Sequence, residues 1–99
     1  MSMLNSCKSS GKQSADADIT TVPTLLYGIS LVNGGAACYA VVTDGNGGSE
    51  IAEANEGGTT AGIQHDVWFD NPVVCPLGIS VNVNGTSAYY YVYYQVYGS

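Results

Sequence analysis

The dominant feature of the sequence is a succession of short segments in which apolar and polar residues alternate, separated by clusters of Gly, Asn and Pro. Alternation with a period of two is typical of β-strands, whose successive side chains point to opposite faces. Such segments cover residues 19–22, 24–32, 37–43, 62–70, 73–75, 78–83 and 87–97. They predict an all-β fold, an antiparallel β-sandwich, with a small barrel as the alternative. Their spacing leaves a jelly-roll and an immunoglobulin-like strand order equally open.

Glycine-rich segments mark the turns. Residues 33–35, 44–48 and 84–85 carry tight-turn or hairpin signals, because Gly tolerates positive φ. Residues 50–54 can begin a further strand, yet residues 50–56 are also the only segment with helical character. That segment is too short and too poorly capped to predict a secure helix.

The first eighteen residues differ in composition from the rest. Residues 1–18 have little apolar content after Leu4, which predicts a flexible N-terminal arm, with the β-sandwich domain covering 19–99. Both cations, Lys8 and Lys12, lie in the first twelve residues of the arm, and all eight acidic residues follow Lys12. This positive segment beside an acidic body could lie on a neighbouring subunit, so both lysines are candidate interface residues; an untethered tail is the alternative. An acidic body repels phosphate backbones, and we expect no nucleic-acid partner.

The chain shows no apolar run long enough to cross a bilayer and no hydrophobic leader. We therefore expect that the protein does not associate with a membrane and that it is made and assembled in a host cytoplasm. Three cysteines without a C-x-x-C pair support neither a disulfide framework nor a zinc site. Cys38 and Cys75 lie in apolar strands and are expected to be buried. Residues 44–50 could attract calcium, but they lack the alternating acidic positions of an EF-hand loop. We therefore expect no metal and no cofactor.

Catalytic residue patterns are also missing from the sequence. His65 is the only histidine, and on a strand its neighbour Asp66 points to the other face, so the two do not form a dyad. No G-x-S-x-G nucleophile motif is present. A lone strand histidine among apolar neighbours is more often packed and hydrogen-bonded. We predict that the protein is not an enzyme.

The content of charged residues is unusually low. They make up 10% of the chain, against about 25% in ordinary soluble domains. Either other protein covers much of the surface, or the surface is rich in Ser, Thr, Asn and Gly. Composition alone favours neither explanation.

The last predicted strand has no polar face. In an extended chain, one face carries Tyr90, Val92, Tyr94 and Val96, and the other carries Tyr89, Tyr91, Tyr93 and Tyr97. The valine-bearing face is the better candidate for the core. Tyrosine is enriched at protein interfaces, because its ring brings apolar area and a hydroxyl at little entropic cost. A strand buried on both faces, or a surface ladder of cross-strand tyrosine pairs, is the alternative. The predicted interface residues are Tyr89, Tyr91, Tyr93, Tyr97, Lys8 and Lys12.

Several segments together resemble small β-rich bacteriophage virion accessory proteins of the capsid decoration or cement type. The similar segments are residues 26–35, 41–45, 69–72, 78–85 and the closing aromatic strand. The resemblance implies an antiparallel β-sandwich that attaches to a virus particle as a homo-oligomer, with a trimer favoured. It implies the major capsid protein or another virion protein as partner, and it transfers no functional residue. The aromatic end departs from the valine-rich ends of this group, which leaves a tail-associated or fibre-base position open.

The expected function is therefore that of a virion structural protein, a decoration or cement subunit that stabilises the shell through multivalent protein contacts. The alternative is a carbohydrate- or ligand-binding β-sandwich, including a tail- or head-fibre-associated one, in which exposed tyrosines and Trp68 stack on a sugar.

Overall fold

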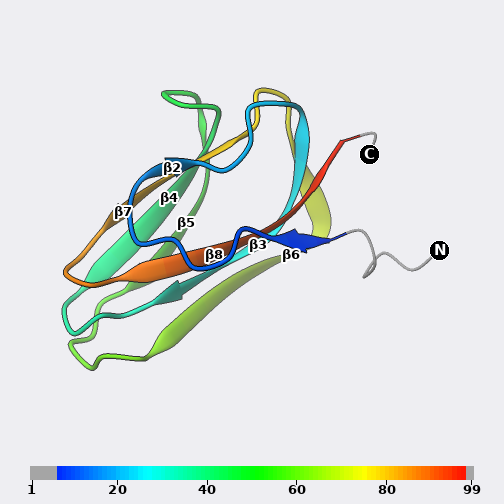
Figure 1. Ribbon diagram of the computed structural model, residues 1–99. Coiled ribbons are helices and arrows are strands. Elements are labelled where there is room, and N and C mark those ends of the chain that lie inside the picture. Colours follow the sequence, from blue (N-terminus) through cyan, green and yellow to red (C-terminus); the bar gives the residue numbers. More distant parts are fainter. Residues whose placement is uncertain (1–6, 98–99) are drawn as a thin grey trace.

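In the part of the chain that the structure describes, β-strands are the only regular secondary structure. A computed structural model describes residues 7–97, with eight strands and no helix among them (Figure 1). The strands are β1 (Lys8–Ser9), β2 (Ala17–Asp18), β3 (Thr24–Val32), β4 (Cys38–Asp44), β5 (Glu50–Glu56), β6 (Gln64–Cys75), β7 (Ile79–Asn84) and β8 (Tyr89–Val96). No helix suited to crossing a bilayer occurs between residues 7 and 97. The all-β prediction is confirmed.

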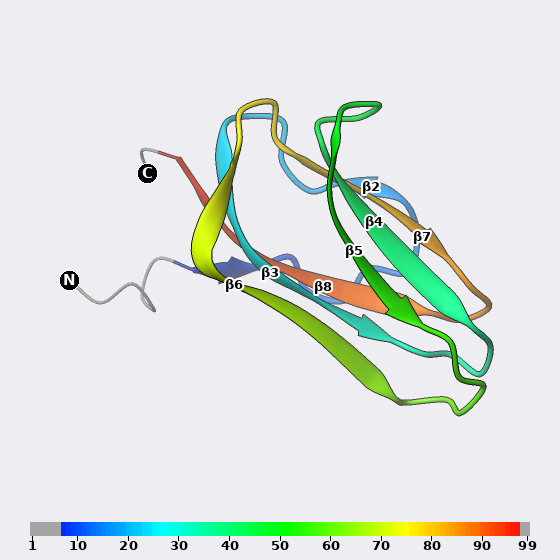
Figure 2. The ribbon, with the colours of Figure 1, turned by 180° about the vertical axis from the view of Figure 1, so that it is seen from behind.

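The strands form two antiparallel four-stranded sheets that pack face to face, which confirms the β-sandwich. Sheet A has the order β1-β8-β3-β6 and sheet B the order β2-β7-β4-β5 (Figures 1 and 2). Strand β4 pairs with β5, β3 with β6, β2 with β7 and β1 with β8, one pair nested within the next. This nesting is the strand order of a jelly roll, and it excludes the immunoglobulin-like alternative.

The glycine-rich turns have two different roles. Only the β4–β5 connection, residues 45–49, is a hairpin between consecutive strands in the described chain. The turns at 33–35 and 84–85 instead carry the chain from one sheet to the other, so the hairpin prediction for 84–85 is wrong. The two turns pack against each other: a Cβ on Gly34 would lie 2.3 Å from the carbonyl oxygen of Ser87. A glycine is needed here for close approach of two backbones.

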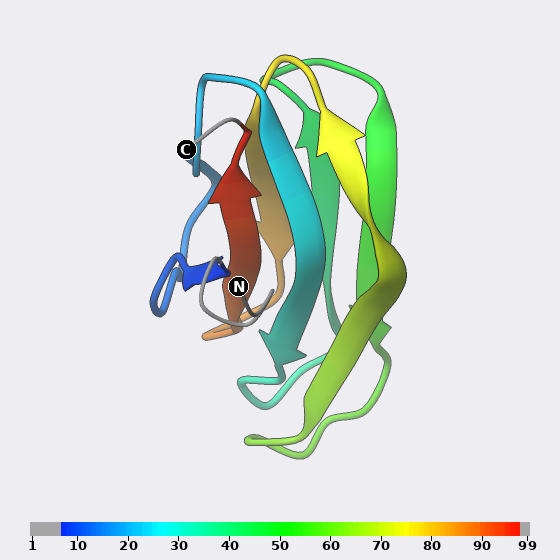
Figure 3. The same ribbon diagram turned by 90° about the vertical axis from the view of Figure 1, so that its right-hand side faces the viewer.

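Three other strand predictions change in the structure. Residues 19–22, predicted as a short strand, form none, because the chain there passes from sheet B to sheet A. Residues 50–56 form strand β5, so their helical character is not realised. The segments 62–70 and 73–75 join into the single strand β6, although Pro72 lies within it. Proline is tolerated because β6 is an edge strand, whose outward N–H groups need no partner. Figure 3 shows the bend of β6 about its middle.

Residues 7–18, here called the strap, are part of the sandwich. The strap first pairs with β8, through Lys8 opposite Tyr94, and then with β7, through Ala17 opposite Val81. Between these strands, Gln13 exchanges two backbone hydrogen bonds of 2.9 Å with Tyr90. Figure 3 shows the strap on the side of β8 away from β3. The predicted boundary at residue 18 therefore does not coincide with a structural one, because the polar strap pairs with one edge of each sheet.

The core lies between the sheets, and β8 contributes to it as predicted. Tyr90 and Val92 are fully buried, and Tyr94 packs against the core cluster. The hydroxyl of Tyr90 donates a 2.8 Å hydrogen bond to the carbonyl oxygen of Ala15 in the strap. Cys38 and Cys75 are buried free thiols, as predicted. The inward face of β8 thus joins the two sheets to the strap.

Asn33 joins the sheet-crossing loops at one end of the sandwich. Its side chain is 1% exposed. The amide nitrogen donates to the carbonyl of Gly58 at 2.7 Å, and the amide oxygen accepts from the N–H of Gly35 at 2.6 Å. Its backbone exchanges hydrogen bonds with Ile63 and Gly62. One buried amide therefore connects the β3–β4 loop to the β5–β6 loop.

We predict that Asn33→Ala lowers the free energy of unfolding by about 2–3 kcal/mol, because buried backbone groups lose their partners. Chemical denaturation monitored by circular dichroism measures this change. Asn82→Ala, at an exposed position of β7, is the control and should change stability by less than about 0.5 kcal/mol. Equal effects of the two substitutions would contradict the role given to Asn33.

A second prediction concerns alkaline pH. Burial, assisted by the charge of Asp16, raises the pKa of Tyr90 to about 12, against about 10 in an unfolded chain. The folded state therefore favours the neutral phenol, and this stabilisation is complete below pH 10 and lost as the pH rises towards 12. Denaturation at pH 8 and pH 11 should show a larger loss of stability for the native protein than for Tyr90→Phe. Tyr39→Phe changes a tyrosine that is 40% exposed. This variant should lose as much stability between pH 8 and pH 11 as the native protein does. An equal loss in all three proteins would contradict the prediction.

Candidate functional site: the outer aromatic face of sheet A

The outer side of sheet A carries most of the exposed and half-buried aromatic rings. Residues from β8, β3 and β6 lie next to one another there in three rows. The rows are Tyr89–Val32–Gln64, Tyr91–Ser30–Asp66 and Tyr93–Gly28–Trp68. We call the side chains of Tyr89, Tyr91, Tyr93, Trp68 and Asp66 the aromatic face. It draws on two strands that lie on either side of β3, so it exists only in the folded sheet.

Trp68 and Tyr93 stack across the central strand. Their ring centroids are 4.8 Å apart, with an angle of 26° between the planes. Gly28 lies between them in the register, and a Cβ on it would lie 2.6 Å from the indole Cε3 atom of Trp68. The missing side chain of Gly28 therefore provides the space in which Trp68 leans towards Tyr93. Trp68 nevertheless remains 55% exposed.

The other end of the aromatic face holds a cation. Tyr89 and Tyr91 meet edge to face, with centroids 6.1 Å apart. The ammonium nitrogen of Lys12 lies 4.3 Å from the centroid of the Tyr89 ring. This distance is typical of a cation–π interaction. The strap thus places one of its two lysines on the aromatic face of its own chain.

Asp66 is the acidic group of the aromatic face. Its carboxylate accepts a 2.8 Å hydrogen bond from the amide of Gln64. Hydrogen bonds from Gln64 and from Ser30 lower the pKa of Asp66 below its ordinary value. The carboxylate is therefore ionised at neutral pH and held in position by its neighbours.

The structure brings four of the six predicted interface residues together. Tyr89, Tyr91 and Tyr93 share the outer face as predicted, and Lys12 lies against Tyr89. All three rings are half-buried rather than fully exposed, because neighbouring side chains cover them. Tyr97 is 61% exposed beyond the end of β8, where its N–H donates to a backbone carbonyl. Lys8 is exposed on β1.

Trp68 is absent from the predicted interface residues, although it is the most exposed ring of the aromatic face. The alternation of residues 64–70 places it on the face opposite Val67, which is visible in the sequence. The sequence does not show that β6 and β8 lie on either side of the same strand, β3. Only the sheet order brings Trp68 onto the same surface as the tyrosines.

His65 differs from its prediction. It is exposed, opposite Leu31 near the start of β6. An edge strand leaves its first residues uncovered, so the histidine is not packed. Among residues 7–97, no group of three His, Cys, Asp or Glu side chains is placed to hold a metal ion.

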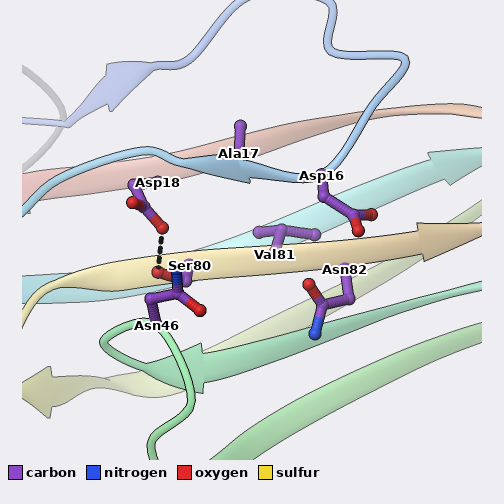
Figure 4. A pocket seen from close by; sticks show the side chains of 7 residues that line it. All are labelled: Asp16, Ala17, Asp18, Asn46, Ser80, Val81 and Asn82. Carbon is purple, nitrogen blue, oxygen red and sulfur yellow. Dashed lines mark hydrogen bonds between the residues drawn. The ribbon is translucent and has the colours of Figure 1, made fainter.

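A shallow polar hollow on sheet B is the second surface feature. The residues that line it are Asp16, Ala17, Asp18, Asn46, Ser80, Val81 and Asn82 (Figure 4). Its two carboxylates already have partners. Asp16 accepts from the N–H of Val83 at 2.8 Å, and Asp18 accepts from the hydroxyl of Ser80 at 2.7 Å. These bonds attach the strap to β7, and the carboxylates thus have a structural role.

The carboxylate at the β4–β5 turn, Asp44, also has a structural role. Asp44 accepts a 2.8 Å hydrogen bond from the N–H of Leu77. Its backbone N–H donates to Ser49, and Gly48 donates to Gly45. The glycines of this segment form the hairpin that the sequence predicts, and its acidic residue connects the turn to the β6–β7 loop.

The chain matches no family model, no curated protein and no solved structure. The function has to be argued from the fold and from the aromatic face.

We predict that Gly28→Ala displaces Trp68 and lowers the free energy of unfolding by about 1–3 kcal/mol, because the new methyl group would overlap the indole and the backbone of β6. Tryptophan fluorescence should shift to longer wavelength as the indole loses its contact with Tyr93. Gly57→Ala is the matched control, since a Cβ there has no neighbour within 4 Å. An unchanged emission spectrum in Gly28→Ala would contradict the stacking.

Proposed function

We propose that the protein is a structural subunit of a virus particle, of the capsid decoration or cement type, and that it works by protein–protein contacts rather than catalysis. The observation that carries this proposal is the aromatic face, an exposed Trp68 stacked on Tyr93 beside a row of tyrosines. Aromatic residues on one face of a rigid sheet are typical of interfaces, where they supply most of the binding energy.

Two further properties support an assembly role. Charged residues make up only 10% of the chain, which fits a surface that other protein covers in part. The jelly roll is a fold of many viral capsid domains. Likeness of fold is an analogy, and it supports the proposal only together with the resemblance to phage accessory proteins and the aromatic face.

In this proposal the protein acts as a homo-oligomer, with a trimer favoured, and binds the major capsid protein or another virion protein. Each copy contributes a modest contact, and several linked copies bind far more tightly than one. The strap covers one edge of each sheet, which limits edge-to-edge pairing of strands there and leaves the sheet face for specific contacts.

A carbohydrate-binding module is the second candidate. The exposed Trp68, next to the polar side chains of Gln64 and Asp66, favours it, because sugars bind to aromatic rings flanked by hydrogen-bonding groups. The two functions differ in their partners. Binding to neutral oligosaccharides by a monomer supports the module, and co-sedimentation with particles supports the structural subunit.

We predict that Tyr91→Ser combined with Tyr93→Ser weakens association while the β-type circular dichroism stays intact, because both rings belong to the outer face. Light scattering after size-exclusion chromatography measures the oligomer, and co-sedimentation measures binding to particles. Tyr39→Ser is the control, since Tyr39 is an exposed tyrosine on β4 of the other sheet. Loss of the β-type spectrum in the double variant would place the two rings in the core. Unchanged association would remove the aromatic face from the interface.

A further inference from the structure

The aromatic face combines an exposed indole with a fixed negative charge. Asp66 and Trp68 are two residues apart on β6, so they share one face and lie about 7 Å apart along the strand. Tyr93 covers one side of the indole, and the side chain is still 55% exposed. The Asp66 carboxylate accepts a hydrogen bond from Gln64, which holds it in place next to the indole.

The same face already binds a cation at its other end. The Lys12 ammonium lies over the ring of Tyr89. In the described part of the chain, no ammonium group is found over Trp68. The lysines, at positions 8 and 12, both belong to the strap. The strap pairs with β8, whereas Trp68 is on β6 at the opposite edge of sheet A. Within residues 7–97, no lysine therefore lies between the indole and the carboxylate.

The charge of the protein is complementary to a basic partner. The net charge is −6, and the two open edges of the sandwich, β5 and β6, contain acidic residues and no lysine or arginine. Such a surface attracts positively charged groups and increases the rate of their association.

We propose that the aromatic face accepts an arginine side chain of the partner protein, whose guanidinium group stacks on the indole of Trp68 and pairs with the carboxylate of Asp66. This inference rests on the proposed assembly function, and it specifies the chemistry of the partner surface. Arginine fits better than lysine, because its planar guanidinium can stack on an aromatic ring and bond a carboxylate at the same time. A neutral sugar could stack on the ring and donate a hydroxyl hydrogen bond to the carboxylate, but it brings no positive charge to pair with it.

The single tryptophan of the chain provides the measurement. Blocked tripeptides of arginine, lysine and citrulline are titrated into the full-length protein while the fluorescence of Trp68 is recorded. Citrulline has the shape of arginine without its charge. We expect a saturable change with the arginine peptide, a weaker one with the lysine peptide and none with the citrulline peptide at the same concentrations.

Two variants with the same change in charge test the site. Asp66→Asn should weaken binding of the arginine peptide by about fivefold or more, because a charge-assisted hydrogen bond is lost. Glu50→Gln removes an exposed carboxylate from β5, in the other sheet, and it should change the affinity by less than about twofold at physiological salt. Circular dichroism checks that both variants keep the β-fold.

Three outcomes would overturn the inference. They are the absence of a saturable change with the arginine peptide, equal weakening in both variants, which would indicate unspecific attraction, and saturable binding of cellohexaose or chitohexaose in its place. Co-sedimentation with particles is measured separately. If the protein co-sediments and the arginine peptide does not bind, the assembly function stands and the arginine site is rejected.

Discussion

The pairing of β3 with β8 is the interaction on which the rest of the structure depends. The two strands are central in sheet A and are paired along almost their full length, from Thr24 opposite Val96 to Val32 opposite Tyr89. This register turns Tyr90 and Val92 into the core and Tyr89, Tyr91 and Tyr93 outwards. A slip of one residue would exchange the two faces of β8. The core and the aromatic face are therefore two consequences of one alignment.

The strap extends the sheets by pairing with β8 and with β7. It is too polar to form a core of its own, but it follows β8 and then β7, and the buried hydroxyl of Tyr90 holds its middle. Tyr90 thus has two roles, a packed ring and a hydrogen-bond donor to the strap. The strap also brings Lys12 onto Tyr89, which links the edge of the sandwich to the proposed interface. The two opposite edges, β5 and β6, are protected instead by their acidic side chains and by Pro72.

The functional proposal and the arginine site follow from how the aromatic rings are held. Gly28 leaves the space in which Trp68 meets Tyr93, and the rings support one another while part of their surface remains accessible. Rigid rings lose little entropy when a partner binds, so such a face is suited to tight contacts. The carboxylate of Asp66 adds a preference for positive charge.

The alternation of residues in the sequence was sufficient to predict the all-β fold, the inward and outward faces of β8, the buried cysteines and most strand positions, because these depend on local periodicity. It could not distinguish hairpins from sheet-crossing loops, as residues 84–85 show, since the same Gly and Asn signals serve both. Nor could it place Trp68 beside Tyr93 or attach residues 7–18 to the sheets. Those contacts join segments far apart in the chain, and only the order of strands in the folded sheets decided them.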